Sequence, residues 1–165
     1  DYHVAIAHPT TLHREQGPVR DYLHRFSRHN NLLETPHPDG GRFLTFGLPP
    51  WSHLLVWPDG RLAFLEFMPD LHDRCTMQLR LFATSDAMDS ASADAWLMQL
   101  LTFLEEDKAL VESAQHGYRD EFKPGPPHRL ERRILHWQGL YRERLGLAGI
   151  SIVERSQEAI SALRS

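Results

Sequence analysis

The chain has 165 residues, of which 41% are hydrophobic and 24% are charged, as is usual for globular proteins. This length predicts one domain with room for a sizeable core, and we assign residues 1–165 to a single domain. The formal net charge is -4, and the scattered arginines form no basic stripe that would follow phosphates. Composition therefore gives no indication of a nucleic-acid partner.

The sequence also gives no indication of a membrane or a secretory pathway. No apolar run approaches the roughly 18 residues that a membrane-spanning helix needs, and no segment has the pattern of a signal peptide. The single cysteine, Cys75, cannot form an internal disulfide and fits a reducing compartment. We therefore expect a cytoplasmic protein.

The first twelve residues, DYHVAIAHPTTL, place two histidines on a short apolar stretch that Pro9 ends. His3 and His8 lie five residues apart. Residues 10–30, which are polar and rich in arginine, carry apolar side chains at helical spacing. They predict a helix and loop covering the first segment, although a solvated connector fits equally well.

The middle of the chain predicts an antiparallel sheet, because aromatic and β-branched residues alternate with polar ones between turn signals. The cluster at 36–41 and the Pro-Asp-Gly turn at 58–60 are the clearest breaks. Another turn is expected at 69–73. The predicted strands cover residues 42–48, 52–57, 61–68 and 75–84.

Two helices are predicted after the sheet. The longer one covers about 93–117, with Ser90 and Ser92 as candidate N-caps and Gly117 where a helix would end. The second covers about 129–145, and its arginines could face an electron-transfer partner or simply solvent. A short strand-like piece from 150 and a short helix from 156 complete the chain. This order favours an α+β fold, an antiparallel sheet packed on a long C-terminal helix.

The long helix carries a candidate metal ligand, Asp107. An apolar stripe at helical spacing is formed by Leu97, Leu100, Leu101, Leu104 and Val111. At about 100° per residue, Asp107 falls on the edge of this stripe, whereas Glu105 and Glu106 point toward solvent. A buried carboxylate is costly unless it is paired or binds a metal. Asp107 is therefore either a ligand or the partner of a buried His or Arg.

Two histidines and one carboxylate suit a mononuclear Fe(II) site that leaves open positions for oxygen and substrate. His3 and His8 are too far apart to share one face of a regular helix, where such pairs sit at i and i+4. Pro9 disfavours helical backbone at His8, so its ring can turn back toward His3. The alternative is two ordinary histidines, because the chain has 11.

Three segments together resemble the catalytic domain of Rieske-type non-haem iron oxygenases, the ring-hydroxylating alpha subunits. Residues 1–9 resemble the family's Tyr-His-x4-His ligand segment. Residues 103–117 resemble its carboxylate-ligand helix, and residues 131–141 resemble its closing helix. The resemblance implies that His3, His8 and Asp107 are catalytic residues that bind Fe(II), with Tyr2 beside them.

The resemblance also implies the helix-grip fold of lipid-transfer domains, here expected to be incomplete at its N-terminus. A cavity between sheet and helix would hold an aromatic or other apolar substrate. Its expected lining includes Phe46, Leu54, Phe64 and Phe67. Oxygen from O2 would be inserted into this substrate, as in aromatic hydrocarbon catabolism by mono- or dioxygenases.

The electrons would have to come from outside this chain. A Rieske 2Fe–2S cluster needs two cysteines and two histidines, and Cys75 is the only cysteine. The resemblance implies an N-terminal Rieske domain that this chain lacks. It also implies a ferredoxin or reductase that delivers NAD(P)H electrons, and a trimer in the complete protein.

Two other classes of function remain open. A metal-free domain of the same fold could bind an apolar ligand. A zinc hydrolase could use the same three ligands, but no glutamate lies beside either histidine, as a His-Glu-x-x-His site would require.

Overall fold

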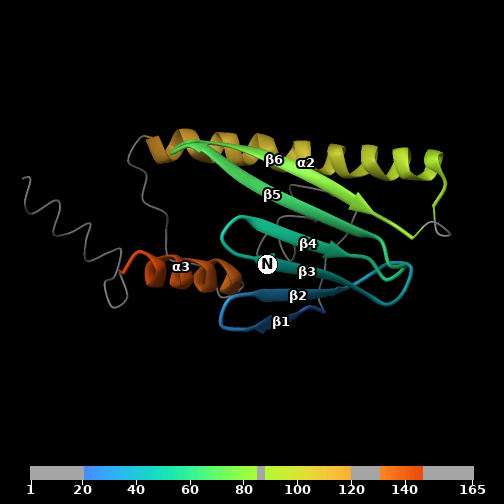
Figure 1. The fold of residues 1–165 in the computed structure, drawn as a ribbon, viewed down its shortest axis with the longest axis horizontal. Coiled ribbons are helices and arrows are strands. Elements are labelled where there is room, and N and C mark those ends of the chain that lie inside the picture. Colours follow the sequence, from blue (N-terminus) through green and yellow to red (C-terminus); the bar gives the residue numbers. More distant parts are fainter. Residues whose placement is uncertain (1–20, 85–87, 120–130, 147–165) are drawn as a thin grey trace, which may run out of the picture.

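The computed structural model describes residues 21–84, 88–119 and 131–146, which form a six-stranded antiparallel sheet and two helices (Figure 1). The predicted α+β class is confirmed, and the arrangement is consistent with a helix-grip domain. The strands are β1 (Leu23–Phe26), β2 (Asn31–Pro36), β3 (Arg42–Leu48), β4 (Ser52–Val56), β5 (Leu62–Leu71) and β6 (Arg74–Phe82). The helices are α2 (Ser90–Arg119) and α3 (Arg132–Arg144).

The strands follow one another across the sheet in chain order, from β1 to β6. Short turns therefore connect neighbours, and Gly40, Gly41 and Gly60 provide the positive φ angles that two of these turns need. The predicted turn at 69–73 is shorter than expected. β5 continues to Leu71, with an irregularity in its register at Pro69, where a proline that cannot donate to the ladder is tolerated.

The predicted helix and loop over residues 10–30 is corrected in the part that the structure describes, from residue 21 onward, whereas residues 10–20 lie outside the described residues. Residues 23–26 form β1, which pairs with β2 through a turn at Ser27 and Asn30. The Ser27 hydroxyl accepts hydrogen bonds from the backbone N–H groups of His29 and Asn30, which fixes that turn. The helical spacing was misleading because a short edge strand need not alternate.

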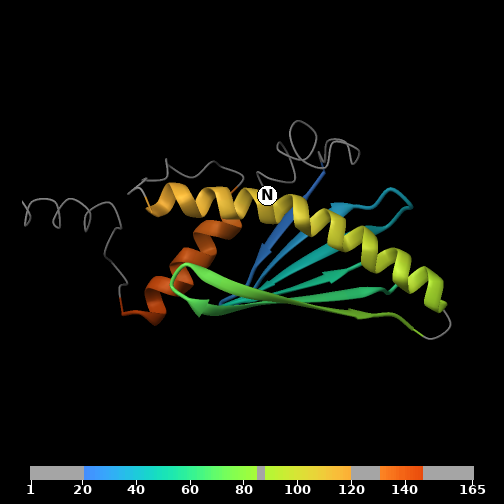
Figure 2. The ribbon, with the colours of Figure 1, turned by 90° about the horizontal axis from the view of Figure 1, so that it is seen from above.

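Both helices lie on the same face of the sheet, which we call the inner face (Figure 2). Pairing partners share a face in an antiparallel sheet, so Ala63 and Leu65, which are buried in the core, identify it. Trp96 of α2 completes this core cluster. Six inner-face residues form one row across the strands: Phe26, Asn31, Gly47, His53, Leu65 and Leu79.

Three of the four expected cavity-lining residues lie on the opposite, outer face. Phe46, Leu54 and Phe64 are neighbours in one row there, and all three are half-buried. Only Phe67 packs against the core beneath the helix. Successive side chains along a strand point to opposite faces. The face that each expected lining residue occupies therefore depends on the strand register, which composition does not provide.

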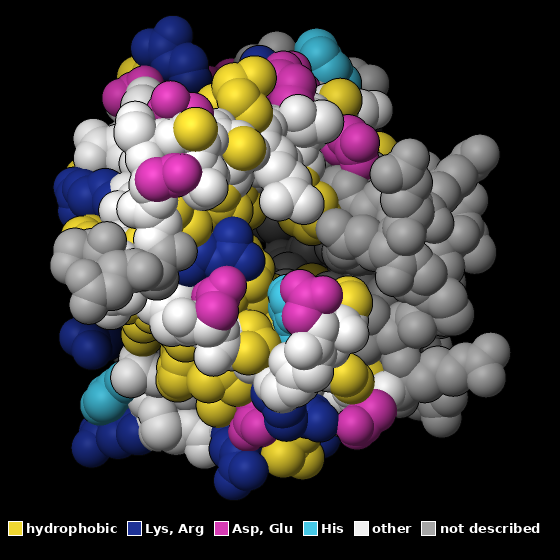
Figure 3. Space-filling view, turned by 90° about the vertical axis from the view of Figure 1, so that its right-hand side faces the viewer, with side chains coloured by type: hydrophobic (Ala, Val, Ile, Leu, Met, Phe, Trp, Pro, Cys, Tyr) yellow, Lys and Arg dark blue, Asp and Glu magenta, His cyan; other side chains and the backbone are white. Residues whose placement is uncertain are grey.

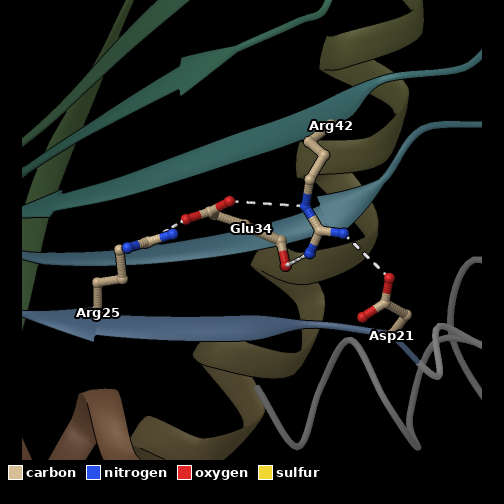
Figure 4. Close-up of polar contacts among 4 residues, drawn as sticks. All are labelled: Asp21, Arg25, Glu34 and Arg42. Atoms are coloured by element: carbon tan, nitrogen blue, oxygen red, sulfur yellow. Dashed lines mark hydrogen bonds and ion pairs between the residues drawn. The ribbon is translucent and has the colours of Figure 1, made fainter.

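The outer face carries a chain of ionic contacts at its β1–β2 edge (Figure 4). Glu34 is mostly buried, with 14% of its side chain exposed, and one of its carboxylate oxygens lies 2.6 Å from Arg25 Nε. The other oxygen lies 3.6 Å from Arg42 Nε, and Arg42 also lies 3.0 Å from Asp21. This network covers the edge with charge, which protects an edge strand from pairing with other chains.

Helix α2 is longer than predicted at both ends, because it starts at Ser90 and runs through Gly117 to Arg119. Its cap is Asp89 rather than Ser90 or Ser92. The Asp89 carboxylate accepts a hydrogen bond from the Ser92 backbone N–H at 2.8 Å, as an N-cap does. Hydrogen bonds from the Ser92 side chain and from its backbone N–H lower the pKa of Asp89.

Candidate metal site and interior polar cluster

Asp107 lies on the side of α2 that faces the sheet. The buried or half-buried residues of this helix recur at helical spacing through Trp96, Leu100 and Leu104, and Asp107 continues the series one turn later. Leu100 and Leu104 pack against the core cluster. Glu105 and Glu106 are exposed, as predicted, whereas Asp107 is half-buried. Leu101 and Val111, which were expected on the apolar stripe, are 42% and 68% exposed.

The other two candidate ligands, His3 and His8, lie outside the described residues, as does Tyr2. Within residues 21–84, 88–119 and 131–146, no three His, Cys, Asp or Glu side chains gather closely enough to hold a metal ion. Any metal bound through Asp107 would therefore need ligands from other parts of the chain.

The inner face of the sheet carries polar as well as apolar side chains, and His53 is one of the polar ones. His53 lies on β4, directly opposite Leu65 of the core and Gly47 of β3. Its ring meets Phe67 edge-on, with centroids 6.0 Å apart. Burial and the nearby charge of Arg133 lower the pKa of His53 to about 4. The imidazole is therefore neutral at neutral pH.

Arg133 of α3 supplies the charge beside His53. Its Nε donates a hydrogen bond to Asn31 Oδ1 at 2.6 Å. Because the guanidinium is largely buried, its pKa falls to about 10, so it remains a cation at neutral pH. Burial lowers the pKa of His24 as well, and Arg132 and Arg133 contribute to this shift.

Asn31 connects Arg133 to the rest of a hydrogen-bonded cluster. It is 4% exposed, and its Nδ2 donates to His136 Nδ1 at 3.3 Å. His136 therefore carries its hydrogen on Nε2, which donates to the Ser27 carbonyl at 3.0 Å. Gly47 makes room for this cluster, since a Cβ there would lie 2.5 Å from Asn31 Oδ1.

The end of the inner face where β4 ends and β5 begins lies opposite the end that carries His53. Figure 3 shows a hollow on this side of the molecule, and both hydrophobic and charged side chains of the described residues lie at its edge. At this end of the sheet, Arg61 lies over the rings of Trp57 and Trp96, 5.8 Å and 5.1 Å from their centroids. Its Nε is 2.7 Å from Asp59.

Sequence reasoning missed His53 and Arg133 as interior groups. His53 stands in an otherwise apolar strand, SHLLVW, and alternation would have placed it on the same face as Leu55 and Trp57. Alternation along this strand was therefore sufficient to predict that His53 lies on the inner face. Arg133 could not have been found in this way, because its position depends on how α3 packs on a sheet formed about a hundred residues earlier.

Neither of the two described helices combines the length and the apolar composition that a membrane crossing requires. Cys75 is a free, exposed thiol.

A comparison with protein families gives a match over residues 13–147 to the ring-hydroxylating alpha subunit, catalytic domain. The matched range includes Asp107 but begins after His3 and His8. No curated protein and no solved structure gives a significant match. The family is one of oxygenases, a class of oxidoreductases, and it implies non-haem iron and the metabolism of aromatic compounds. Because the match spans well over half of the sequence, the chain belongs to the family of ring-hydroxylating alpha subunits and represents their catalytic domain.

Proposed function

We propose that this chain is the oxygen-activating catalytic domain of a Rieske-type oxygenase, and that it inserts oxygen from O2 into an aromatic or other apolar substrate. The family match over residues 13–147 carries this proposal. The half-buried carboxylate of Asp107, on the sheet-facing side of α2, supports it.

His3, His8 and Asp107 would hold one Fe(II) ion. Two imidazoles and a carboxylate form the donor set that suits non-haem iron with open coordination positions. A carboxylate that is half-buried beside Leu104 fits this role, because a bound cation offsets the cost of removing its charge from water. When bound, the iron would supply the activation of oxygen.

The chain's own contribution would be to hold the substrate and exclude water. Leu55 and Phe67 are half-buried and pack against the core cluster on the inner face, and an aromatic ring could pack beside them. A dry interior also strengthens the electrostatic interactions within it. The substrate would therefore be bound mainly through its ring.

The electrons would come from a Rieske cluster outside this chain. Such a cluster needs two cysteines, whereas Cys75 is the only one here. A Rieske domain upstream in the complete protein, a trimer of subunits, and a ferredoxin or reductase using NAD(P)H would form the electron supply.

Iron content tests the proposal directly. The chain is purified without oxygen, loaded with Fe(II), and analysed for bound metal and for the electron spin resonance signal of its nitric oxide adduct. We expect about one iron per chain, from the single three-ligand set proposed. Alanine at His3, His8 or Asp107 should abolish binding while the circular dichroism spectrum stays unchanged.

Glu106→Ala is the matched control, because this carboxylate is adjacent to Asp107 but exposed. It should retain iron. Full iron content in a triple His3, His8 and Asp107 variant would mean that the metal is bound elsewhere. A folded chain that binds an apolar ligand but no stoichiometric iron would instead favour a metal-free binding domain.

A further inference from the structure

Helix α3 contacts the sheet through polar side chains and carries an apolar stripe on its opposite side. His136 faces the sheet, where it donates to the Ser27 carbonyl and accepts from Asn31. At about 100° per residue, the positions opposite His136 are 134, 138, 141 and 145. Three of them are large, apolar and about half exposed: Ile134 49%, Tyr141 52% and Leu145 55%. An amphipathic helix normally turns its apolar side to the core, so this α3 stripe indicates a partner surface.

Arginines flank the α3 stripe. Arg142 and Arg144, in the last turn of the helix, lie on either side of it. Glu143, between them, lies 3.9 Å from Arg28 instead, and Arg142 Nε has no hydrogen-bond partner among the described residues. The stripe is therefore an apolar surface with a cationic edge, which complements an apolar surface with an acidic edge.

The solvent side of α2 has this complementary character. Trp96 lies in the core, and the positions on the opposite side of the helix are 94, 98, 101, 105 and 112. Met98 and Leu101 are 61% and 42% exposed. The remaining members of this α2 stripe are exposed carboxylates: Asp94, Glu105 and Glu112.

The α2 stripe is also hollowed. A shallow depression in this surface is lined by Leu101, Thr102, Glu105 and Glu106. Lys108, which donates to Glu105 at 3.0 Å, offsets one of the negative charges, and the stripe stays acidic.

The two stripes have the same spacing. Positions 94, 98, 101 and 105 of α2 are separated by four, three and four residues, as are positions 134, 138, 141 and 145 of α3. Helices with apolar side chains at this spacing pack side by side. Carboxylates lie at both ends of the Met98–Leu101 pair, so Arg142 and Arg144 would meet an acid in either orientation of α3.

One copy of the chain presents both stripes together. Both helices lie on the inner face of the sheet (Figure 2), and each stripe is opposite the side chains that hold its helix there. Two copies related by a two-fold axis can therefore form the same contact twice, with α3 of each copy on α2 of the other.

We propose that a second copy of this chain docks on these stripes. The apolar side chains of the α3 stripe pack on Met98 and Leu101 of the other copy, and Arg142 and Arg144 pair with its Asp94 and Glu105. This inference is independent of the proposed oxygenase function, because none of these residues is a proposed iron ligand.

Charge reversal tests the contact in the full chain. Sedimentation at about 1–100 µM, where interfaces of small area associate, should show a monomer–dimer equilibrium. The pair Arg142→Glu and Arg144→Glu should weaken association at least about tenfold, because like charges then meet across the contact. The pair Asp94→Lys and Glu105→Lys should do the same.

Mixing these two variant chains should restore association, because each reversed stripe then meets a complementary one. Two alternating variants can close a dimer but not a ring of three copies. Restoration therefore separates this contact from the trimer expected of the complete protein.

Two charge reversals elsewhere are the matched controls. Arg80 lies on the outer face, where it pairs with Glu66, and Asp39 is 89% exposed in the β2–β3 turn. Arg80→Glu and Asp39→Lys should leave association unchanged.

The apolar part of the contact is tested without a change of charge. Leu101→Gln should weaken association by about tenfold, because less apolar surface is then buried. Leu23→Gln is its control, since Leu23 is 44% exposed and lies on the outer face beside Glu34. An unsubstituted chain that is monomeric at about 100 µM, or a mixture of the two variants that associates no better than either alone, would overturn the proposal.

Discussion

At the scale of single residues, the lowered pKa of His53 makes the stability of the fold depend on pH. Its pKa is lowered to about 4 in the folded chain, first by burial and then by the charge of Arg133. The unfolded chain binds this proton near pH 6.5, the ordinary value for histidine. Protonation therefore favours unfolding, and the stabilisation that is complete above pH 6.5 is lost as the pH falls toward 4.

We predict that the free energy of unfolding falls between pH 6.5 and pH 4 by up to about 3 kcal/mol through His53 alone. His24 changes stability in the same direction, because its pKa is also lowered. Urea unfolding measured at several pH values should show a flatter profile for His53→Leu than for the unsubstituted chain. An equal slope in both would mean that His53 is not buried from solvent.

At the scale of elements, the cluster around Asn31 connects α3 to the sheet. Gly47→Ala should disrupt it, because the added Cβ would lie 2.5 Å from the Asn31 oxygen that accepts the Arg133 hydrogen bond. We expect a loss of about 1–3 kcal/mol in the free energy of unfolding, typical of overpacking. Chemical denaturation measures this loss.

Gly139→Ala provides the opposite control within α3. A Cβ at Gly139 would meet nothing within 4 Å, so alanine should stabilise the helix by about 0.5–1 kcal/mol. Equal effects of the two substitutions would indicate that the close approach of Gly47 to Asn31 has no energetic consequence.

The elements differ in how far the sequence could predict them. The strands β3 to β6 follow from local signals, namely alternation and the turn at 58–60. The strand β2 was missed because Asn31, Glu34 and Pro36 are poor strand formers, and it is held by pairing on both sides. Local propensity cannot report such pairing.

The same distinction applies to the candidate site. Asp107 could be assigned to the sheet-facing side of α2 because a helix has a fixed period. The row that joins Asn31, Gly47 and His53 depends on the register between three strands. Arg133 comes close to that row only when α3 packs on the sheet. Contacts of this range are set by tertiary packing, for which one sequence carries little direct signal.

At the scale of the whole molecule, α2 is attached to the sheet by a small group of side chains. The described core contains only four buried hydrophobic residues: Leu33, Ala63, Leu65 and Trp96. Trp96 is the largest of these, and it alone comes from a helix. Arg61 and Trp57 pack against its ring. The position of Asp107 relative to the sheet therefore depends on Trp96.

We predict that Trp96→Ala lowers the free energy of unfolding by about 3–5 kcal/mol, as is usual when a large buried aromatic side chain is removed. This is a substantial part of the stability of a typical domain. Iron affinity should fall in parallel, because α2 would no longer hold Asp107 against the sheet. By contrast, Asp107→Ala should remove iron without destabilising the fold.

Trp51→Ala is the control, since Trp51 is 45% exposed. Its loss should change neither the free energy of unfolding nor the iron affinity much. Denaturant unfolding and metal analysis on the same samples distinguish the two effects. If Trp96→Ala lost stability but kept full iron affinity, the metal site would be independent of the packing between α2 and the sheet.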